Sequence, residues 1–213
     1  DNPTFHASIG WDWISTIRGR NIGIWNDVRV VSEGSVSLDS PYVKTVLPLP
    51  DTTSAVLTPE VIVKNNGQSK ACGILAGRIG EITFEQEVEL AAGEERTVRF
   101  CPETYPQLKM ENPKLWWPNG YGEQNLYKAE FTFAADGNIS DRVDFNVGIR
   151  QVDAKEIDEV LFLYINGRRF IGRGGNWGFS ENNLRYRARE YDIAIAYHAD
   201  MNFTIMRNWV GQT

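Results

Sequence analysis

The sequence contains little of the chemistry that metal centres and nucleophilic catalysis use. It has two cysteines, Cys72 and Cys101, and two histidines, His6 and His198, all far apart along the chain. Zinc sites need clusters of such residues, often with a CxxC pair, and no CxxC occurs. We therefore predict no metal and no cofactor. A disulfide across a β-sandwich is one reading of the cysteines, but we expect buried free thiols, because cysteine packs as a small hydrophobic residue.

Positive charge and long apolar runs are also scarce. The formal net charge is -6, and the lysines and arginines form no cluster. Nucleic acids bind through clustered cations, so we predict no nucleic-acid partner. A transmembrane helix needs about 18 or more consecutive apolar residues, and the sequence has no such run. We therefore predict no membrane span.

Aromatic residues, by contrast, are abundant. They make up 12% of the sequence and include seven tryptophans, and 42% of all residues are hydrophobic, which is enough to form a core. Two tryptophans are adjacent in the segment LWWPNGYGEQNLY (115–127). Neighbouring side chains of an extended chain point to opposite faces, so Trp116 and Trp117 cannot both enter one core. Pro118, Asn119 and Gly120 are typical of a turn. We interpret the segment as a sandwich corner covered by a neighbouring domain, not as a sugar-stacking platform.

The middle of the chain alternates between apolar and polar residues. In EITFEQEVEL (81–90), the apolar side chains fall on one face and the glutamates on the other, which predicts a half-buried strand. Similar runs occur at 127–133 and 143–149, and EVIVK (60–64) followed by NNG predicts a hairpin with 71–79. These strands predict an immunoglobulin-like antiparallel β-sandwich over about residues 38–150. The expected core includes Phe84, Val88, Leu90, Phe131, Phe133, Val143 and Phe145.

The pattern changes after Gln151. LFLYINGRRF predicts two strands joined by Asn166 and Gly167. Residues 184–200 carry apolar side chains at helical spacing, and the apolar run FTIMRNW follows them. A strand, a helix and a strand form a βαβ unit, which rarely stands alone. We expect it to open a larger α/β domain.

Three segments together resemble glycoside hydrolase family 2, and its exo-β-D-glucosaminidase and β-mannosidase branch in particular. They are GWDWISTIRGRNIGIWNDVRV (10–30), PKLWWPNGYGEQNLY (113–127) and the stretch from Phe162 to Trp209. The resemblance implies a mainly β chain with three parts. Residues 1–37 would be the C-terminal strands of a sugar-binding jelly roll, residues 38–152 the immunoglobulin-like sandwich, and residues 153–213 the βαβ start of a (β/α)8 TIM barrel.

The resemblance also implies a sugar site. A pyranose has apolar C–H faces that suit indole rings, and hydroxyl edges that suit carboxylate, amide and guanidinium groups. Active sites of TIM barrels lie at the C-terminal ends of the strands. Trp13 and Trp25 are better explained as core residues, whereas Trp11 and Asp12 could equally cap a sandwich and Arg207 could form a structural ion pair. The predicted substrate-binding residues are Trp11, Asp12, Arg173, Asn176, Trp177, Arg207 and Trp209.

The resemblance places the catalytic residues elsewhere. A retaining glycosidase uses two carboxyl groups about 5 Å apart. In this family they follow the fourth and seventh barrel strands, and the chain has no Asn-Glu dipeptide, the family's usual acid/base context. We therefore predict no catalytic residue here. The chain would be a non-catalytic part of a retaining β-glycosidase, secreted or periplasmic by family analogy, that removes terminal β-linked glucosamine or mannose from oligosaccharides.

The expected partners are an oligosaccharide and the remaining domains of the parent protein. An isolated chain would expose open domain ends, which could dock onto a second copy. An alternative function is a stand-alone β-sandwich module for carbohydrate binding or scaffolding, and a further one is a cell-surface adhesion domain. The βαβ segment separates these readings, because a binding module has no use for the first strand and helix of a barrel.

Overall fold

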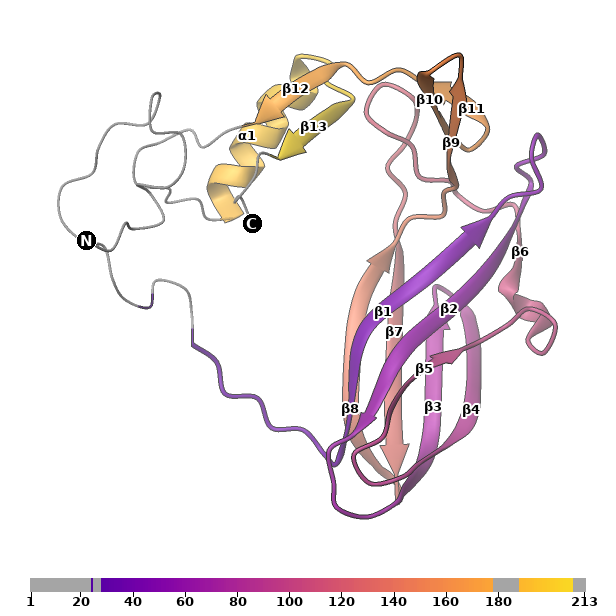
Figure 1. The fold of residues 1–213 in the computed structure, drawn as a ribbon, viewed down its shortest axis with the longest axis vertical. Coiled ribbons are helices and arrows are strands. Elements are labelled where there is room, and N and C mark those ends of the chain that lie inside the picture. The colour runs from indigo at the N-terminus through magenta and orange to yellow at the C-terminus, as the bar shows by residue number, and fades with distance from the viewer. Residues whose placement is uncertain (1–23, 25–27, 178–187, 209–213) are drawn as a thin grey trace. The chain divides into compact units, whose positions relative to one another are not determined.

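The computed structural model describes residues 24, 28–177 and 188–208. The chain divides into two compact units (Figure 1). One unit spans 31–117 and 121–170. Of the described residues, the other contains 171–177 and 188–208 together with 24, 28–30 and the short segment Pro118–Gly120.

The first unit is built around a β-sandwich of two four-stranded antiparallel sheets (Figure 1). In one sheet the order is β1-β2-β5, and β6 also pairs with β2; in the other the order is β4-β3-β7-β8. The strands of the first sheet are β1 (Val36–Val46), β2 (Ser54–Asn65), β5 (Glu95–Arg99) and β6 (Lys109–Glu111). Those of the second are β3 (Ala71–Ile79), β4 (Ile82–Leu90), β7 (Tyr127–Ala135) and β8 (Asn138–Val147).

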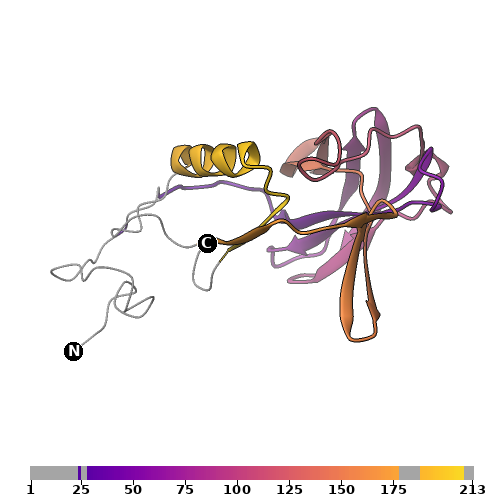
Figure 2. The ribbon, with the colours of Figure 1, turned by 90° about the horizontal axis from the view of Figure 1, so that it is seen from above.

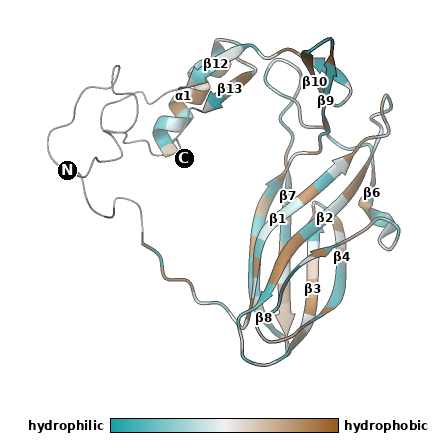
Figure 3. Cartoon of the chain, viewed as in Figure 1, coloured by the Kyte–Doolittle hydropathy of each residue, from teal (hydrophilic) through white to brown (hydrophobic). Residues whose placement is uncertain are grey.

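The core lies between the two sheets and is formed by alternate positions of the strands (Figure 3). Phe84, Phe100 and Phe131 form its aromatic centre, with ring centroids of Phe84 and Phe100 4.6 Å apart. The expected alternation of 81–90 is confirmed, because Phe84, Val88 and Leu90 are buried and the glutamates between them are exposed. Burial of Phe131 and Phe133 is confirmed as well. Val143 and Phe145 are only half-buried and pack against the edge of the core.

Two expectations for the sandwich are wrong. The segment NNG does not join a hairpin, because β2 and β3 belong to different sheets and the connection between them crosses from one sheet to the other. The two cysteines are free, as expected, but Cys72 is exposed and Cys101 is half-exposed. Cys72 lies on the outer face of β3, directly opposite Glu89, so its position in the strand turns it away from the core.

A small three-stranded sheet completes the first unit. Its strands are β9 (Val152–Ile157), β10 (Val160–Ile165) and β11 (Arg168–Phe170), in the order β11-β10-β9. β9 and β10 form a hairpin that projects from the sandwich (Figure 2). β10 and β11 are joined at Asn166 and Gly167, with φ of 50° and 77°, as the sequence predicts for an Asn-Gly turn.

The second unit contains the predicted βαβ segment. β12 (Gly174–Trp177) is followed by α1 (Ala188–Asp200) and then by β13 (Ile205–Asn208). β12 and β13 pair in parallel, which confirms the strand, helix and strand order. Of the predicted helix 184–200, residues 184–187 lie outside the described residues. In the described part of the chain, no helix has the length and apolar character that crossing a membrane requires.

Candidate functional site

Two of the predicted sugar-binding residues meet on the parallel strand pair. Asn176 of β12 and Arg207 of β13 are direct register partners, and each is the last residue but one of its strand. Arg207 Nη1 donates a hydrogen bond of 3.0 Å to Asn176 Oδ1, and both side chains are exposed. An amide and a guanidinium are therefore held side by side at the C-terminal ends of two parallel strands.

The start of β12 explains how its backbone comes so close to β13. A Cβ atom on Gly174 would lie 1.8 Å from the carbonyl oxygen of Ile205, so no residue with a side chain fits there without displacing β13. Gly174 pairs with Ile205, two residues before Arg207. The GRGGNW sequence thus allows the close strand pairing that places Asn176 opposite Arg207.

Arg173 lies at the other end of β12. It immediately precedes the first residue of the strand, and its backbone N–H donates to Thr204 Oγ1 at 2.8 Å. Its carbonyl oxygen accepts from the Thr204 N–H at 2.8 Å. Its backbone therefore helps to hold the strand pair together. Its side chain is exposed, and within the described residues it makes no hydrogen bond to Asn176 or Arg207.

The remaining predicted site residues are not described. Trp11, Asp12 and Trp209 lie outside the described residues, as do Trp13 and Trp25, so an approach of Asp12 to Trp209 stays a prediction. For Trp177 the backbone is described as the last residue of β12, but the side chain is not.

The tryptophan pair forms a corner held by its own polar contacts. The Trp116 backbone N–H donates to the Ile149 carbonyl at 3.0 Å, and the Arg150 guanidinium lies 4.2 Å from the Trp116 ring centroid. Trp117 packs on Gly122, where an added Cβ would lie 2.8 Å from Trp117 Cδ1. The two rings are therefore occupied by separate neighbours, in agreement with their interpretation as a corner. That a neighbouring domain covers this corner stays a prediction.

Asn166 is a structural residue of this corner that the sequence did not reveal beyond its turn. It is 4% exposed, and its Nδ2 donates to the Trp116 carbonyl at 3.0 Å. Its Oδ1 accepts from the Gln151 N–H at 2.9 Å. One buried side chain thus ties the hairpin turn to the tryptophan corner and to the chain entering β9.

A surface groove lies elsewhere on the sandwich. It has a volume of about 650 Å³ and is lined by the second half of β1, the end of β8 and the chain that leads into β9. Tyr42, Lys44, Leu126 and Arg150 are among its lining residues. It contains none of the predicted sugar-binding residues, so it adds nothing to the site on β12 and β13.

Three exposed carboxyl groups of the first unit have a lowered pKa. They are Asp51, Glu89 and Asp144, and each pKa is lowered by hydrogen bonds, chiefly from Thr53, Lys70 and Arg142 respectively. A general acid of a glycosidase needs a raised pKa, so none of these three carboxyl groups fits that role. Within the described part of the chain, no three His, Cys, Asp or Glu residues come together as metal ligands.

Comparison with known proteins identifies the family. Residues 36–150, more than half of the chain, match the family described as "Glycosyl hydrolases family 2". The chain belongs to glycosyl hydrolases family 2. The matched range begins at the first residue of β1 and ends shortly after β8, so it coincides with the sandwich.

Members of family 2 with curated names cover nearly the whole chain. A mannosylglycoprotein endo-beta-mannosidase of Lilium longiflorum is 36% identical over 215 residues, which cover 95% of this chain and 22% of that protein. An exo-beta-D-glucosaminidase of Streptomyces avermitilis is 32% identical over 97% of this chain and 23% of its own length. The chain therefore spans less than a quarter of these relatives.

The fold is also similar to that of a solved family 2 structure. The exo-chitosanase of Amycolatopsis orientalis superposes with a TM-score of 0.76 and 26% identity, over 85% of this chain and 21% of that one. This similarity confirms the predicted fold class, a mainly β chain built on an antiparallel β-sandwich.

Proposed function

We propose that this chain is a non-catalytic portion of a retaining β-glycosidase that removes terminal β-linked glucosamine or mannose from oligosaccharides. The observation that carries the proposal is the pairing of Asn176 with Arg207 on parallel strands. The C-terminal ends of parallel strands are where TIM-barrel enzymes bind their substrates. A stand-alone sandwich module would have no use for such a βαβ segment. The names of the relatives, an endo-beta-mannosidase and an exo-beta-D-glucosaminidase, support mannose and glucosamine as the candidate sugars, and the exo name supports a terminal residue.

The paired side chains suit the hydroxyl edge of a sugar. Arg207 has five N–H donors and uses one of its nitrogens on Asn176. Because Asn176 Oδ1 accepts that bond, its Nδ2 is the part of the amide that remains to donate to a hydroxyl oxygen. In the proposed site Arg173 adds a second guanidinium, Trp11, Trp177 and Trp209 stack on the sugar face, and Asp12 accepts from hydroxyl groups. The two catalytic carboxyl groups would come from other parts of the protein.

The test uses the intact protein that carries this chain, assayed on chitosan oligomers and on an aryl β-mannoside. We expect turnover of one of these substrates. We expect Arg207→Ala and Asn176→Ala to lower kcat/KM by about 10-fold to 100-fold through loss of hydrogen bonds to the bound sugar, of which those from Arg207 are charge-assisted. Arg99→Ala is the matched control, because Arg99 is an exposed arginine whose partner, Glu60, also lies on the sandwich. Wild-type activity in Arg207→Ala would refute the site.

The isolated 213-residue chain supplies a second measurement. Because the proposed catalytic carboxyl pair is not part of it, we expect no hydrolysis of either substrate above background. Turnover by the purified chain would contradict the assignment of a non-catalytic role.

A further inference from the structure

The tip of the LWWPNGYG segment makes a contact that its turn chemistry does not explain. Pro118–Gly120 belongs to the same compact unit as the βαβ segment. Asn119 Nδ2 donates two hydrogen bonds of 3.0 Å, one to the carbonyl oxygen of Ala199 and one to that of Phe203. A side chain about 80 residues upstream therefore binds both sides of the connection between α1 and β13.

This contact lies where a helix needs partners. The last carbonyl groups of a helix have no N–H donors within it. Ala199, in the last turn of α1, accepts from the Asn202 N–H at 2.9 Å, and Asn202 has a φ of 61°, which is typical of a helix-terminating residue. The Asn119 amide adds a second donor to Ala199 and also reaches Phe203, beyond the turn. It thus fixes the turn at both ends.

The turn leads directly into the strand that carries Arg207. Thr204 follows Phe203, and its Oγ1 donates to the Ile171 carbonyl at 3.0 Å and accepts from the Arg173 N–H at 2.8 Å. β13 begins at the next residue, in a register that sets Arg207 opposite Asn176. The position of the Arg207 backbone therefore depends on where the turn at 201–204 is held.

We infer that Asn119 is a positioning residue, which holds the α1–β13 turn so that Arg207 lies against Asn176 in the geometry that binds substrate. This inference rests on the proposed function of Arg207 and Asn176. Asn119 itself does not contact the sugar. Its amide is needed as a double donor, so an isosteric carboxylate cannot replace it, and a negative charge near the C-terminus of α1 is unfavourable with the helix dipole.

The test is a double-mutant cycle in the intact protein, assayed below the unfolding temperature of every variant. We expect Asn119→Ala to lower kcat/KM about tenfold and Asn119→Asp to lower it at least as much, with kcat falling more than KM rises. In the Arg207→Ala background, Asn119→Ala should cause no more than a twofold further loss, because the two residues act as one unit. Asn138→Ala, at the exposed first residue of β8, is the matched control and should keep full activity.

The outcomes separate this inference from the proposed function. Activity losses that multiply in the double variant, or full activity in Asn119→Ala, overturn the positioning role while Arg207→Ala still supports the site. If Arg207→Ala itself keeps full activity, the proposed site fails and the positioning role falls with it. Hydrogen exchange of the intact protein, measured without substrate, adds a second readout: Asn119→Ala should speed exchange of the Asn202 and Phe203 amides relative to the wild type, and unchanged exchange there would contradict the positioning role of Asn119.

Discussion

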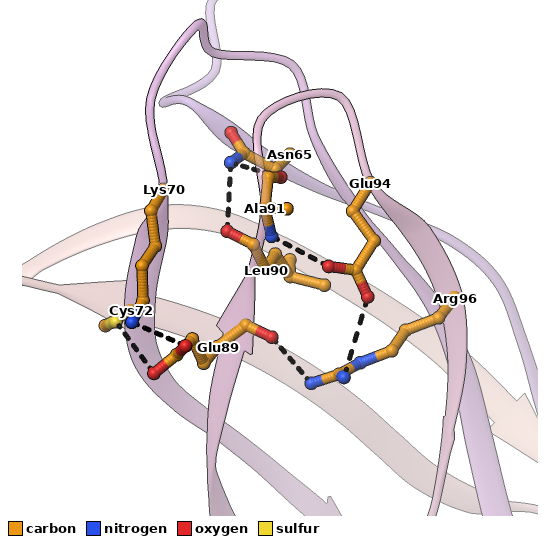
Figure 4. A network of polar contacts seen from close by, with 8 residues as sticks. All are labelled: Asn65, Lys70, Cys72, Glu89, Leu90, Ala91, Glu94 and Arg96. Atoms are coloured by element: carbon orange, nitrogen blue, oxygen red, sulfur yellow. Dashed lines mark hydrogen bonds and ion pairs between the residues drawn. The ribbon is translucent and has the colours of Figure 1, made fainter.

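At the scale of single residues, buried asparagines hold the irregular parts of this fold. Asn65 is fully buried at the end of β2, and its Nδ2 donates to the carbonyl groups of Ser69, at 2.8 Å, and Ala91, at 2.9 Å. Its Oδ1 accepts from the Gly67 N–H at 2.9 Å. It therefore fastens the crossing from β2 to β3 and the β4–β5 turn to each other. Figure 4 shows it near the Lys70–Glu89 and Glu94–Arg96 ion pairs.

We expect Asn65→Ala to lower the free energy of unfolding by about 2 to 3 kcal/mol, because it leaves several buried carbonyl and N–H groups without a partner. Asn66→Ala is the matched control. The side-chain amide of Asn66 is exposed and makes one hydrogen bond, to Ser37 Oγ. Its loss should therefore lower the free energy of unfolding by less than about 0.5 kcal/mol. Urea unfolding followed by tryptophan fluorescence measures both. Equal losses in the two variants would contradict the role of Asn65.

At the scale of elements, a row of ion pairs crosses the outer face of β3, β7 and β8. Arg142 donates two hydrogen bonds to Asp144, from Nη2 to Oδ1 at 2.9 Å and from Nε to Oδ2 at 3.1 Å, and it also forms an ion pair with Glu130. The Oε2 atom of Glu130 lies 4.0 Å from Nη2 of Arg78. The hydrogen bonds from Arg142 lower the pKa of Asp144 below its usual value of 3.8. In the same way Lys70 lowers the pKa of Glu89 below 4.5.

A carboxyl group whose pKa is lower in the folded than in the unfolded state stabilises the fold above its unfolded pKa. That contribution is lost as the pH falls through the folded pKa. We therefore expect the free energy of unfolding to decrease as the pH falls below about 4.5, which is the usual pKa of a glutamate such as Glu89. Asp144→Asn and Arg142→Gln should each make this fall shallower, in urea unfolding at pH 6 and pH 3. Because the groups are exposed, 1 M NaCl should weaken the effect. If the free energy of unfolding of both variants falls with pH as steeply as that of the wild type, the Arg142–Asp144 pair does not contribute to the pH dependence.

The elements also show which features a sequence can predict. Alternation identified β4 and its buried Phe84, because period two reports directly on the two faces of a strand. The Asn-Gly pair correctly predicted the turn at Asn166 and Gly167, because turn chemistry is local. The segment NNG was misread because turn chemistry does not say which sheet the next strand joins, and that choice depends on long-range contacts such as those of Asn65. Asn119 was read only as a turn residue for the same reason, since its partners lie about 80 residues away.

At the scale of the whole molecule, the described residues of the two units differ in how many of their apolar side chains are buried. The sandwich has a core drawn from both sheets, and β3 is paired along both edges, with β4 and β7. In the other unit α1 has no buried residue, and Ile193, Ile195 and Tyr197 are 46%, 51% and 67% exposed. A helix of 13 residues and a two-stranded sheet are each marginal alone.

We therefore expect hydrogen exchange in the 213-residue chain to be slowest in β3 and β7, and at least 100-fold faster in α1, because local opening there exposes little apolar surface. We expect the βαβ segment to open a larger α/β domain whose other elements cover α1. In the intact protein, exchange of the α1 amides should therefore slow by a similar factor, while exchange of the β3 amides stays unchanged. The measurement is exchange followed by mass spectrometry on both proteins, with β3 peptides as the internal control. Slow exchange of α1 in the isolated chain would mean that contacts within these 213 residues already stabilise the helix, and that it does not need further barrel elements to cover its exposed apolar face.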